Sequence, residues 1–82
     1  MNYHLTEHSR DALEKRKIPL EWMERTLNVT EWTEKDPIDE ALEHRLARIP
    51  EFGGRVLRVI VNIKVVPMRI VTVYFDRRRT GK

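Results

Sequence analysis

The side chains of this chain best suited to chemistry are one histidine, two arginines and one tyrosine in its C-terminal half. His44 and Arg48 precede a glycine-containing turn, Arg58 follows it, and Tyr74 lies in the last apolar run. Cleavage of RNA by the adjacent 2′-hydroxyl needs an acceptor for the hydroxyl proton, positive charge for the phosphorane and a donor for the leaving oxygen. Histidine titrates near neutrality, and arginine can hold two phosphate oxygens at once. We therefore expect His44, Tyr74 and Arg58 as catalytic candidates, against the alternative of solvated residues on a half-exposed sheet.

Two strongly apolar runs must position these residues. Arg55–Asn62 and Arg69–Asp76 are dense in valine, isoleucine and aromatic residues, which favour a pleated, half-buried strand. The connection between the runs is too short for a crossover helix, so the two strands should pair antiparallel at the centre of the sheet.

The turn at residues 50–54 decides which side chains meet Arg58. If Gly53 and Gly54 close a five-residue loop, Ile49 lies opposite Arg55, and His44 and Arg48 share the face of Arg58. A slip of one residue would place Arg45 on that face instead, and the sequence leaves this choice open.

Alternation along the last strand separates its two faces. Val71, Val73 and Phe75 form a wholly apolar set that we expect to pack on helices. Ile70, Thr72, Tyr74 and Asp76 form the mixed set that should remain on the open face.

Two short helices are expected before the sheet. Thr6 is a plausible N-cap for a helix over Glu7–Lys17, and a second helix should open at Pro19 or Leu20 and reach about Asn28. Leu20, Met23 and Leu27 would be its buried stripe. A possible short lead-in strand over Asn2–Leu5, a short edge strand within Val29–Asp36 and an extended stretch over Glu43–Pro50 complete the pattern.

The predicted fold class is α+β, with two N-terminal helices packed on one face of a three- or four-stranded antiparallel sheet. Residues 1–76 would form a single domain, because 82 residues leave no room for a second core. Residues 77–82 would be a flexible basic tail.

Composition favours a soluble, cytoplasmic protein. The chain has no cysteine, no apolar run suited to a signal peptide and no stretch near the roughly 18 apolar residues of a membrane helix. Residues 1–42 carry six Lys/Arg and ten Asp/Glu, whereas residues 43–82 carry ten Lys/Arg and three Asp/Glu. Because basic surfaces attract phosphate, Arg48, Arg77 and Arg78 are expected to bind the phosphates of RNA, although solubilising charge is an equal alternative.

Other sites have less support. His4 and His8 lack a third ligand at a familiar spacing, so neither a metal nor another cofactor is expected. Ser9 is the only serine, which leaves little basis for nucleophilic catalysis. His8 and Arg16 lie two turns apart on the first helix, either as structural residues at the helix–sheet border or at the edge of a phosphate-binding groove. The structural role is favoured, because partly buried polar groups usually anchor hydrogen bonds.

Nearly the whole chain resembles a family of small bacterial and archaeal domains of unknown function. The family signature is similar to H-A-x-x-R-x-x-x-R-G-I, a second helix, a strand ending in R-V-V-V and a strand V-T-V-Y. The matching residues are His8, Arg16, Ile18, Arg58-Val59-Ile60-Val61 and Val71-Thr72-Val73-Tyr74.

Three positions depart from this signature. Ser9 stands where alanine is usual, Lys17 replaces the glycine between the helices, and Leu13 lies where arginine or methionine is frequent.

The family is similar in layout to RelE/ParE-type toxins, which have two helices followed by an antiparallel sheet with a basic face. The resemblance implies a toxin that acts on RNA or the ribosome and is silenced by an antitoxin protein. Because one fold carries many functions, a non-catalytic domain that binds a protein or nucleic acid is the alternative. Trp22, Trp32 and the arginine-rich sheet would then form its contact surface.

Overall fold

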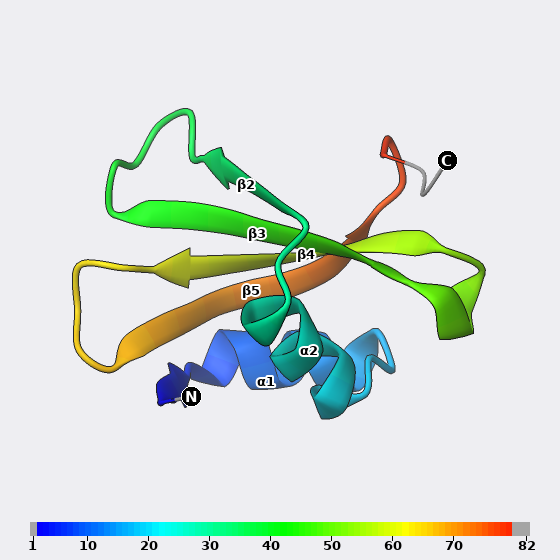
Figure 1. Cartoon of the computed structure of the whole chain (residues 1–82). Coiled ribbons are helices and arrows are strands. Elements are labelled where there is room, and N and C mark those ends of the chain that lie inside the picture. Colours follow the sequence, from blue (N-terminus) through cyan, green and yellow to red (C-terminus); the bar gives the residue numbers. More distant parts are fainter. Residues whose placement is uncertain (1, 80–82) are drawn as a thin grey trace.

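The structure is a computed structural model that describes residues 2–79 of the 82-residue chain. Its sheet has the strand order β1-β5-β4-β3-β2, and both helices lie on one face of that sheet (Figure 1). The elements in chain order are β1 (Tyr3–Leu5), α1 (Glu7–Lys15), α2 (Leu20–Asn28), β2 (Trp32–Lys35), β3 (Leu42–Ile49), the 3-10 turn η1 (Pro50–Phe52), β4 (Arg55–Asn62) and β5 (Met68–Asp76). Neither helix in this described part has the length and apolar character needed to span a membrane.

The predicted α+β class is confirmed, but two details of the predicted sheet are wrong. The sheet has five strands and is mixed, because β1 pairs parallel with β5, and β1 also precedes the helices in the chain. Thr6 explains this arrangement. Its Oγ1 accepts a hydrogen bond from the Ser9 backbone N–H at 3.1 Å as the N-cap of α1, and it also donates to the Ile70 carbonyl at 2.8 Å. The hydrogen bond from Thr6 to Ile70 holds the start of α1 against β5, so the residues that precede it, in β1, lie alongside that strand.

The turn between β3 and β4 has the predicted register. Ile49 is paired with Arg55, and Gly53 and Gly54 take positive φ angles of 67° and 75° that glycine adopts without steric cost. Because directly paired residues point to the same side of a sheet, Arg48 shares the face of Arg58 and Arg45 lies on the opposite face.

A β-bulge between β4 and β5 overturns part of the predicted assignment of side chains to the two faces of the sheet. Ile60 is paired with Thr72, but the next residue, Val61, is paired with Ile70, so Val71 is an extra residue. An extra residue shifts the side-chain alternation by one step. Ile70 is therefore fully buried in the core beneath the helices, whereas Val71 is only partly buried.

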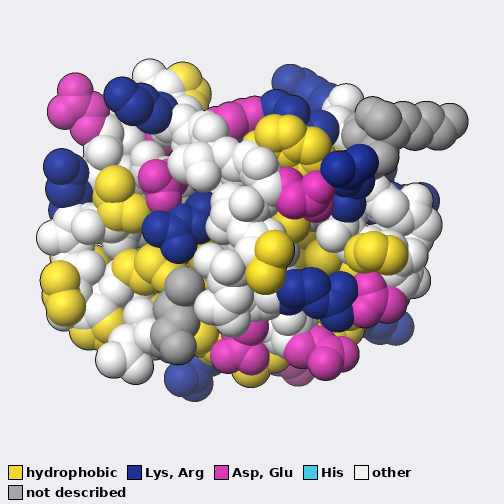
Figure 2. Space-filling view, in the orientation of Figure 1, with side chains coloured by type: hydrophobic (Ala, Val, Ile, Leu, Met, Phe, Trp, Pro, Cys, Tyr) yellow, Lys and Arg dark blue, Asp and Glu magenta, His cyan; other side chains and the backbone are white. Residues whose placement is uncertain are grey.

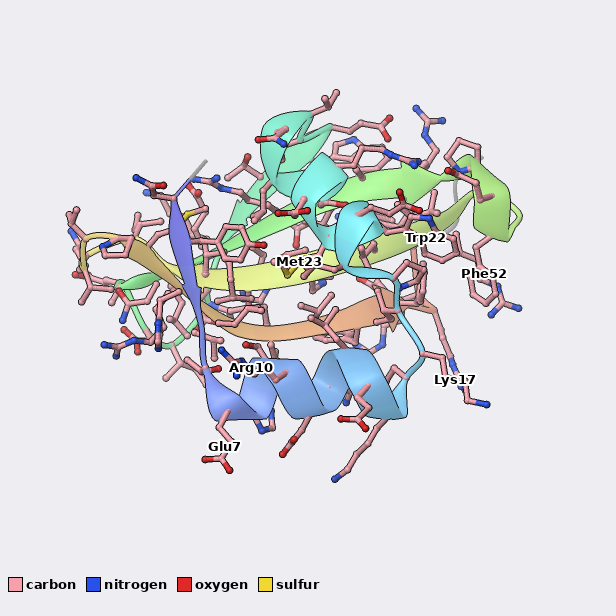
Figure 3. All side chains as sticks on the ribbon, turned by 90° about the horizontal axis from the view of Figure 1, so that it is seen from below. Glu7, Arg10, Lys17, Trp22, Met23 and Phe52 are labelled. Carbon is pink, nitrogen blue, oxygen red and sulfur yellow. The ribbon has the colours of Figure 1, made fainter. Side chains whose placement is uncertain are left out.

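The helices close the core from one side, α1 over β5 and α2 over β4 and β3. Met23 of α2 is fully buried and lies between that helix and the sheet (Figure 3). The predicted stripe is wrong at Leu20, which is 44% exposed, because Thr26 is buried instead. Thr26 tolerates this position since its hydroxyl donates to the Trp22 carbonyl at 2.9 Å.

The first helix is shorter than predicted. It ends at Lys15, and Lys17 takes a positive φ of 53° in the turn to α2 (Figure 3). This left-handed conformation is the one for which glycine is preferred after a helix.

Candidate functional site

The face of the sheet opposite the helices carries a row of four side chains, one from each of four adjacent strands. Arg58 of β4 is paired with Tyr74 of β5 on one side and with Leu46 of β3 on the other, and Leu46 is paired with Trp32 of β2. We call these four residues the central row. The neighbouring row holds Thr72, Ile60, His44 and Glu34. Regular strand pairing alone thus brings the three predicted catalytic residues, His44, Arg58 and Tyr74, onto one face.

Arg58 is held by acceptors on three sides. Its Nε and one Nη donate to Asp76 Oδ2 at 3.2 and 2.5 Å, and its other Nη donates to Glu34 Oε1 at 3.0 Å and to His44 Nδ1 at 2.7 Å. Its side chain is only 12% exposed. Most of its five N–H donors are used inside the protein, so little of the guanidinium can reach an external phosphate.

His44 is fixed at both ring nitrogens. Arginine can only donate, so the bond from Arg58 requires an unprotonated Nδ1 in His44. The neutral ring then carries its hydrogen on Nε2, which lies 2.7 Å from Asp36 Oδ1 and donates to it. In this arrangement His44 has no open nitrogen lone pair with which to take a proton from a substrate.

The carboxylates around this pair are stabilised in their charged form. Hydrogen bonds from Arg58 hold the pKa of Asp76 below its usual range. The pKa of Asp36 is also lowered, first by the Asp39 backbone N–H and then by His44 and the Ile38 backbone N–H. At neutral pH Asp76 is therefore charged and paired with Arg58, whereas the charge of Asp36 is held by backbone N–H groups and the neutral His44.

An open groove of about 580 Å³ lies beside this cluster. Its lining includes Tyr74, Lys35, Arg77 and Arg78 together with His44, Arg58, Glu34 and Asp76. The Arg78 backbone N–H donates to Asp76 Oδ1 at 2.9 Å, which fixes the turn after β5. Arg77 and Arg78 are exposed at the groove. Lys35 is also exposed, but its pairing with Glu43 places it on the other side of the edge strand from Glu34.

The Trp32 end of the central row carries two further arginines. Arg48 donates twice to Glu31 Oε1, at 2.8 and 3.1 Å, and its guanidinium carbon lies 5.3 Å from the Trp32 ring centroid. Arg79 pairs with Glu34 and lies 5.5 Å from the same ring centroid. Arg78 and Arg79 of the predicted tail thus contact residues of the sheet, while residues 80–82 lie outside the described residues.

His8 and Arg16 are not part of this face. His8 is exposed on α1, and Arg16 donates from one Nη to the Val73 carbonyl of β5 at 3.4 Å. Arg16 thereby satisfies a backbone acceptor at the border of helix and sheet, which is the geometry of a structural residue.

Sequence reasoning assigned no role to three carboxylates that engage predicted site residues: Glu31 accepts from Arg48, Glu34 accepts from Arg58, and Asp36 accepts from His44. It also assigned none to Arg79, which pairs with Glu34 and lies near Trp32. Only Asp76 carried a signal, because it is two residues from Tyr74 in the same strand and so shares its face. Within residues 2–79 no group of three or more histidine, cysteine or carboxylate side chains is arranged to hold a metal ion.

Comparison with known proteins identifies a family for this chain. The family model for a domain of unknown function (DUF4258) matches residues 5–75. No curated protein and no solved structure matches the chain significantly.

Proposed function

Because the chain belongs to the DUF4258 family of domains of unknown function, its activity must be inferred from its own residues, and we propose that it is a non-catalytic, nucleic-acid-binding domain. The binding surface would be the helix-free face of the sheet, at the groove beside Tyr74. We further propose that it acts in the cytoplasm.

The observation that carries this proposal is the difference between paired and unpaired cations at one groove. Figure 2 shows basic and acidic side chains intermingled over the visible surface, so the number of cations alone decides nothing. At the groove, however, Glu34 and Asp76 are both engaged by arginine. No carboxylate in the described part of the chain pairs with Lys35, Arg77 or Arg78. Arg77 and Arg78 therefore form a local excess of positive charge beside Tyr74, and Lys35 adds a cation at the edge of the groove.

Nucleic acid fits such a surface better than a small anion. Three cations along an open groove can each neutralise a phosphate of one chain, and the release of counterions then drives binding. Tyr74 offers an aromatic ring beside them, and basic grooves with aromatic side chains are typical of nucleic-acid binding. The buried Arg58–His44 cluster would support the surface rather than react.

Charge removal at matched positions tests this proposal. A variant with Arg77→Gln and Arg78→Gln should bind a labelled RNA oligonucleotide more weakly than the unchanged protein, as measured by fluorescence anisotropy. The control is Arg10→Gln with Lys15→Gln, which removes the same charge from exposed positions on α1 (Arg10 is labelled in Figure 3). Equal loss of affinity in both variants would show attraction by net charge alone and would overturn the proposed surface.

A second candidate function is a RelE-like toxin that cleaves RNA, alone or on the ribosome, and is silenced by an antitoxin protein. The observation in its favour is that His44, Arg58 and Tyr74 all line one groove. Against it stand the occupied ring nitrogens of His44 and the internal ion pairs of Arg58. Induced expression and incubation of messenger RNA with ribosomes separate the two candidates. Growth arrest with cleavage that His44→Ala abolishes would establish the toxin, whereas intact RNA supports the binding domain.

A further inference from the structure

This inference rests on the proposed function and names its ligand: we propose that the helix-free face binds single-stranded nucleic acid, with bases stacked on Tyr74 and Trp32. Both aromatic side chains belong to the central row, and each is partly exposed. They occupy its two ends.

The spacing of the central row suits a single nucleic-acid strand that runs across the β-strands of the sheet. Tyr74 and Trp32 are separated by the two strands that carry Arg58 and Leu46, which makes three strand intervals. Neighbouring strands lie about 4.8 Å apart, so the backbones at the two rings are separated by about 14 Å. Leu46 is fully buried and the Arg58 side chain is only 12% exposed, so these two side chains fill the surface between the two rings.

Unpaired positive charge lies beside Tyr74, where Arg77 and Arg78 line the same groove. At Trp32 the guanidinium carbons of Arg48 and Arg79 lie over the ring, 5.3 and 5.5 Å from its centroid, and both arginines are paired with carboxylates, Glu31 and Glu34. A base that stacks on Trp32 would take the place of a guanidinium on the ring face, whereas a base on Tyr74 would bring its phosphate near Arg77 and Arg78. Stacking of this kind is sequence-tolerant, because every base presents a π-face.

Duplex nucleic acid does not fit the same surface. Its bases stack on one another, so their faces are closed to side chains, and reading its major groove takes a protruding helix or two-stranded ribbon. Both helices lie on the opposite face of the sheet (Figure 1). The helix-free face presents aromatic rings, which an unpaired strand can use and a duplex cannot.

The first experiment compares a single-stranded RNA oligonucleotide with a duplex of the same sequence, using the full chain at fixed salt concentration. The single strand should bind more tightly. Tyr74→Leu should weaken single-strand binding by about 5- to 150-fold, the effect of one lost base–aromatic stack. Tyr74→Phe keeps the ring and loses only the hydroxyl, so it should retain the affinity of the unchanged protein.

The second experiment uses Trp32 as its own reporter. Trp22 lies on α2 and packs against Phe52 (Figure 3), and its ring also contacts that of Phe75. Trp22→Phe therefore leaves Trp32 as the single tryptophan. Addition of the single strand should quench its fluorescence, whereas addition of duplex should leave it unchanged.

The outcomes separate this inference from the proposed function. If neither single strand nor duplex binds, the proposed function fails and the inference fails with it. If duplex binds as tightly as single strand, or if Tyr74→Leu and Tyr74→Phe behave alike, the inference fails while nucleic-acid binding stands. Circular dichroism of each variant confirms that a change in affinity does not arise from unfolding.

Discussion

Arg58 donates a hydrogen bond to His44 Nδ1 across 2.7 Å, and this contact determines what the histidine can do. The neutral ring must carry its hydrogen on Nε2, where it donates to Asp36. Long-range proton–nitrogen NMR of the imidazole should therefore report an Nε2–H tautomer. An Nδ1–H tautomer would mean that Arg58 is elsewhere in solution and that His44 has a free acceptor nitrogen.

Arg58→Leu should destabilise the fold. The substitution leaves Asp76, with a side chain 12% exposed, without its arginine, while Glu34 keeps its pair with Arg79. Removing one partner of a mostly buried ion pair costs about 2 to 4 kcal/mol, because the remaining charge is desolvated and unpaired. The control is Arg69→Leu, which removes the same charge from an exposed position in β5. Urea unfolding measures the stability of both variants. Equal unfolding midpoints would contradict the account of Arg58 as a structural residue.

Acid should weaken the contact between α2 and the turn after β3. Hydrogen bonds from Arg25, at 2.6 and 2.8 Å, are the main reason that the pKa of Glu51 is lowered from 4.5 to about 2. A depressed carboxylate pKa contributes stability above its unfolded value, and that contribution is lost as the pH falls toward the folded value. Stability should therefore decline between about pH 4.5 and pH 2.

Glu51→Gln tests this pH dependence, because it should lower stability at pH 7 and flatten the decline toward pH 2. Glu14→Gln, at an exposed position on α1, serves as the control. Unfolding midpoints at a series of pH values provide the measurement, and identical pH profiles for Glu51→Gln and the unchanged protein would contradict the role of the Arg25–Glu51 pair.

Lys17→Gly should stabilise the protein by up to about 1 kcal/mol, because a side chain at φ 53° is strained and glycine is not. A glycine at an exposed interior position of α1, Arg10→Gly, should have the opposite sign and cost about 1 kcal/mol. Thermal unfolding of the two variants compares them directly. A loss of stability in both would show that the turn at Lys17 carries no strain.

The register of the site could be predicted only in part from local signals. Two adjacent glycines indicated the register that places His44 and Arg48 on the face of Arg58, but a slip of one residue stayed open until the pairing of Ile49 with Arg55 decided it. The bulge at Val71 could not be predicted in this way, since an extra residue leaves no mark in a run of uniformly apolar side chains.

The residues that bind His44 and Arg58 could not be predicted from sequence patterns. Asp36 and Glu34 reach His44 and Arg58 only because β2 pairs with β3, and that pairing depends on tertiary contacts. The parallel pairing of β1 with β5 has the same origin, because it joins segments more than 60 residues apart. Counting charges in the sequence likewise could not distinguish Arg58, whose side chain is mostly buried, from the exposed Arg77 and Arg78.

The most direct test of the central claim follows the indole N–H signals of the two tryptophans by NMR during titration with single-stranded RNA. Trp32 lies on the helix-free face and Trp22 lies on α2, so one spectrum reports on both sides of the sheet. We predict that the Trp32 signal shifts to saturation and that the Trp22 signal stays in place. A shift of Trp22 alone, or no shift of either signal when the RNA is fully bound, would contradict binding at the helix-free face.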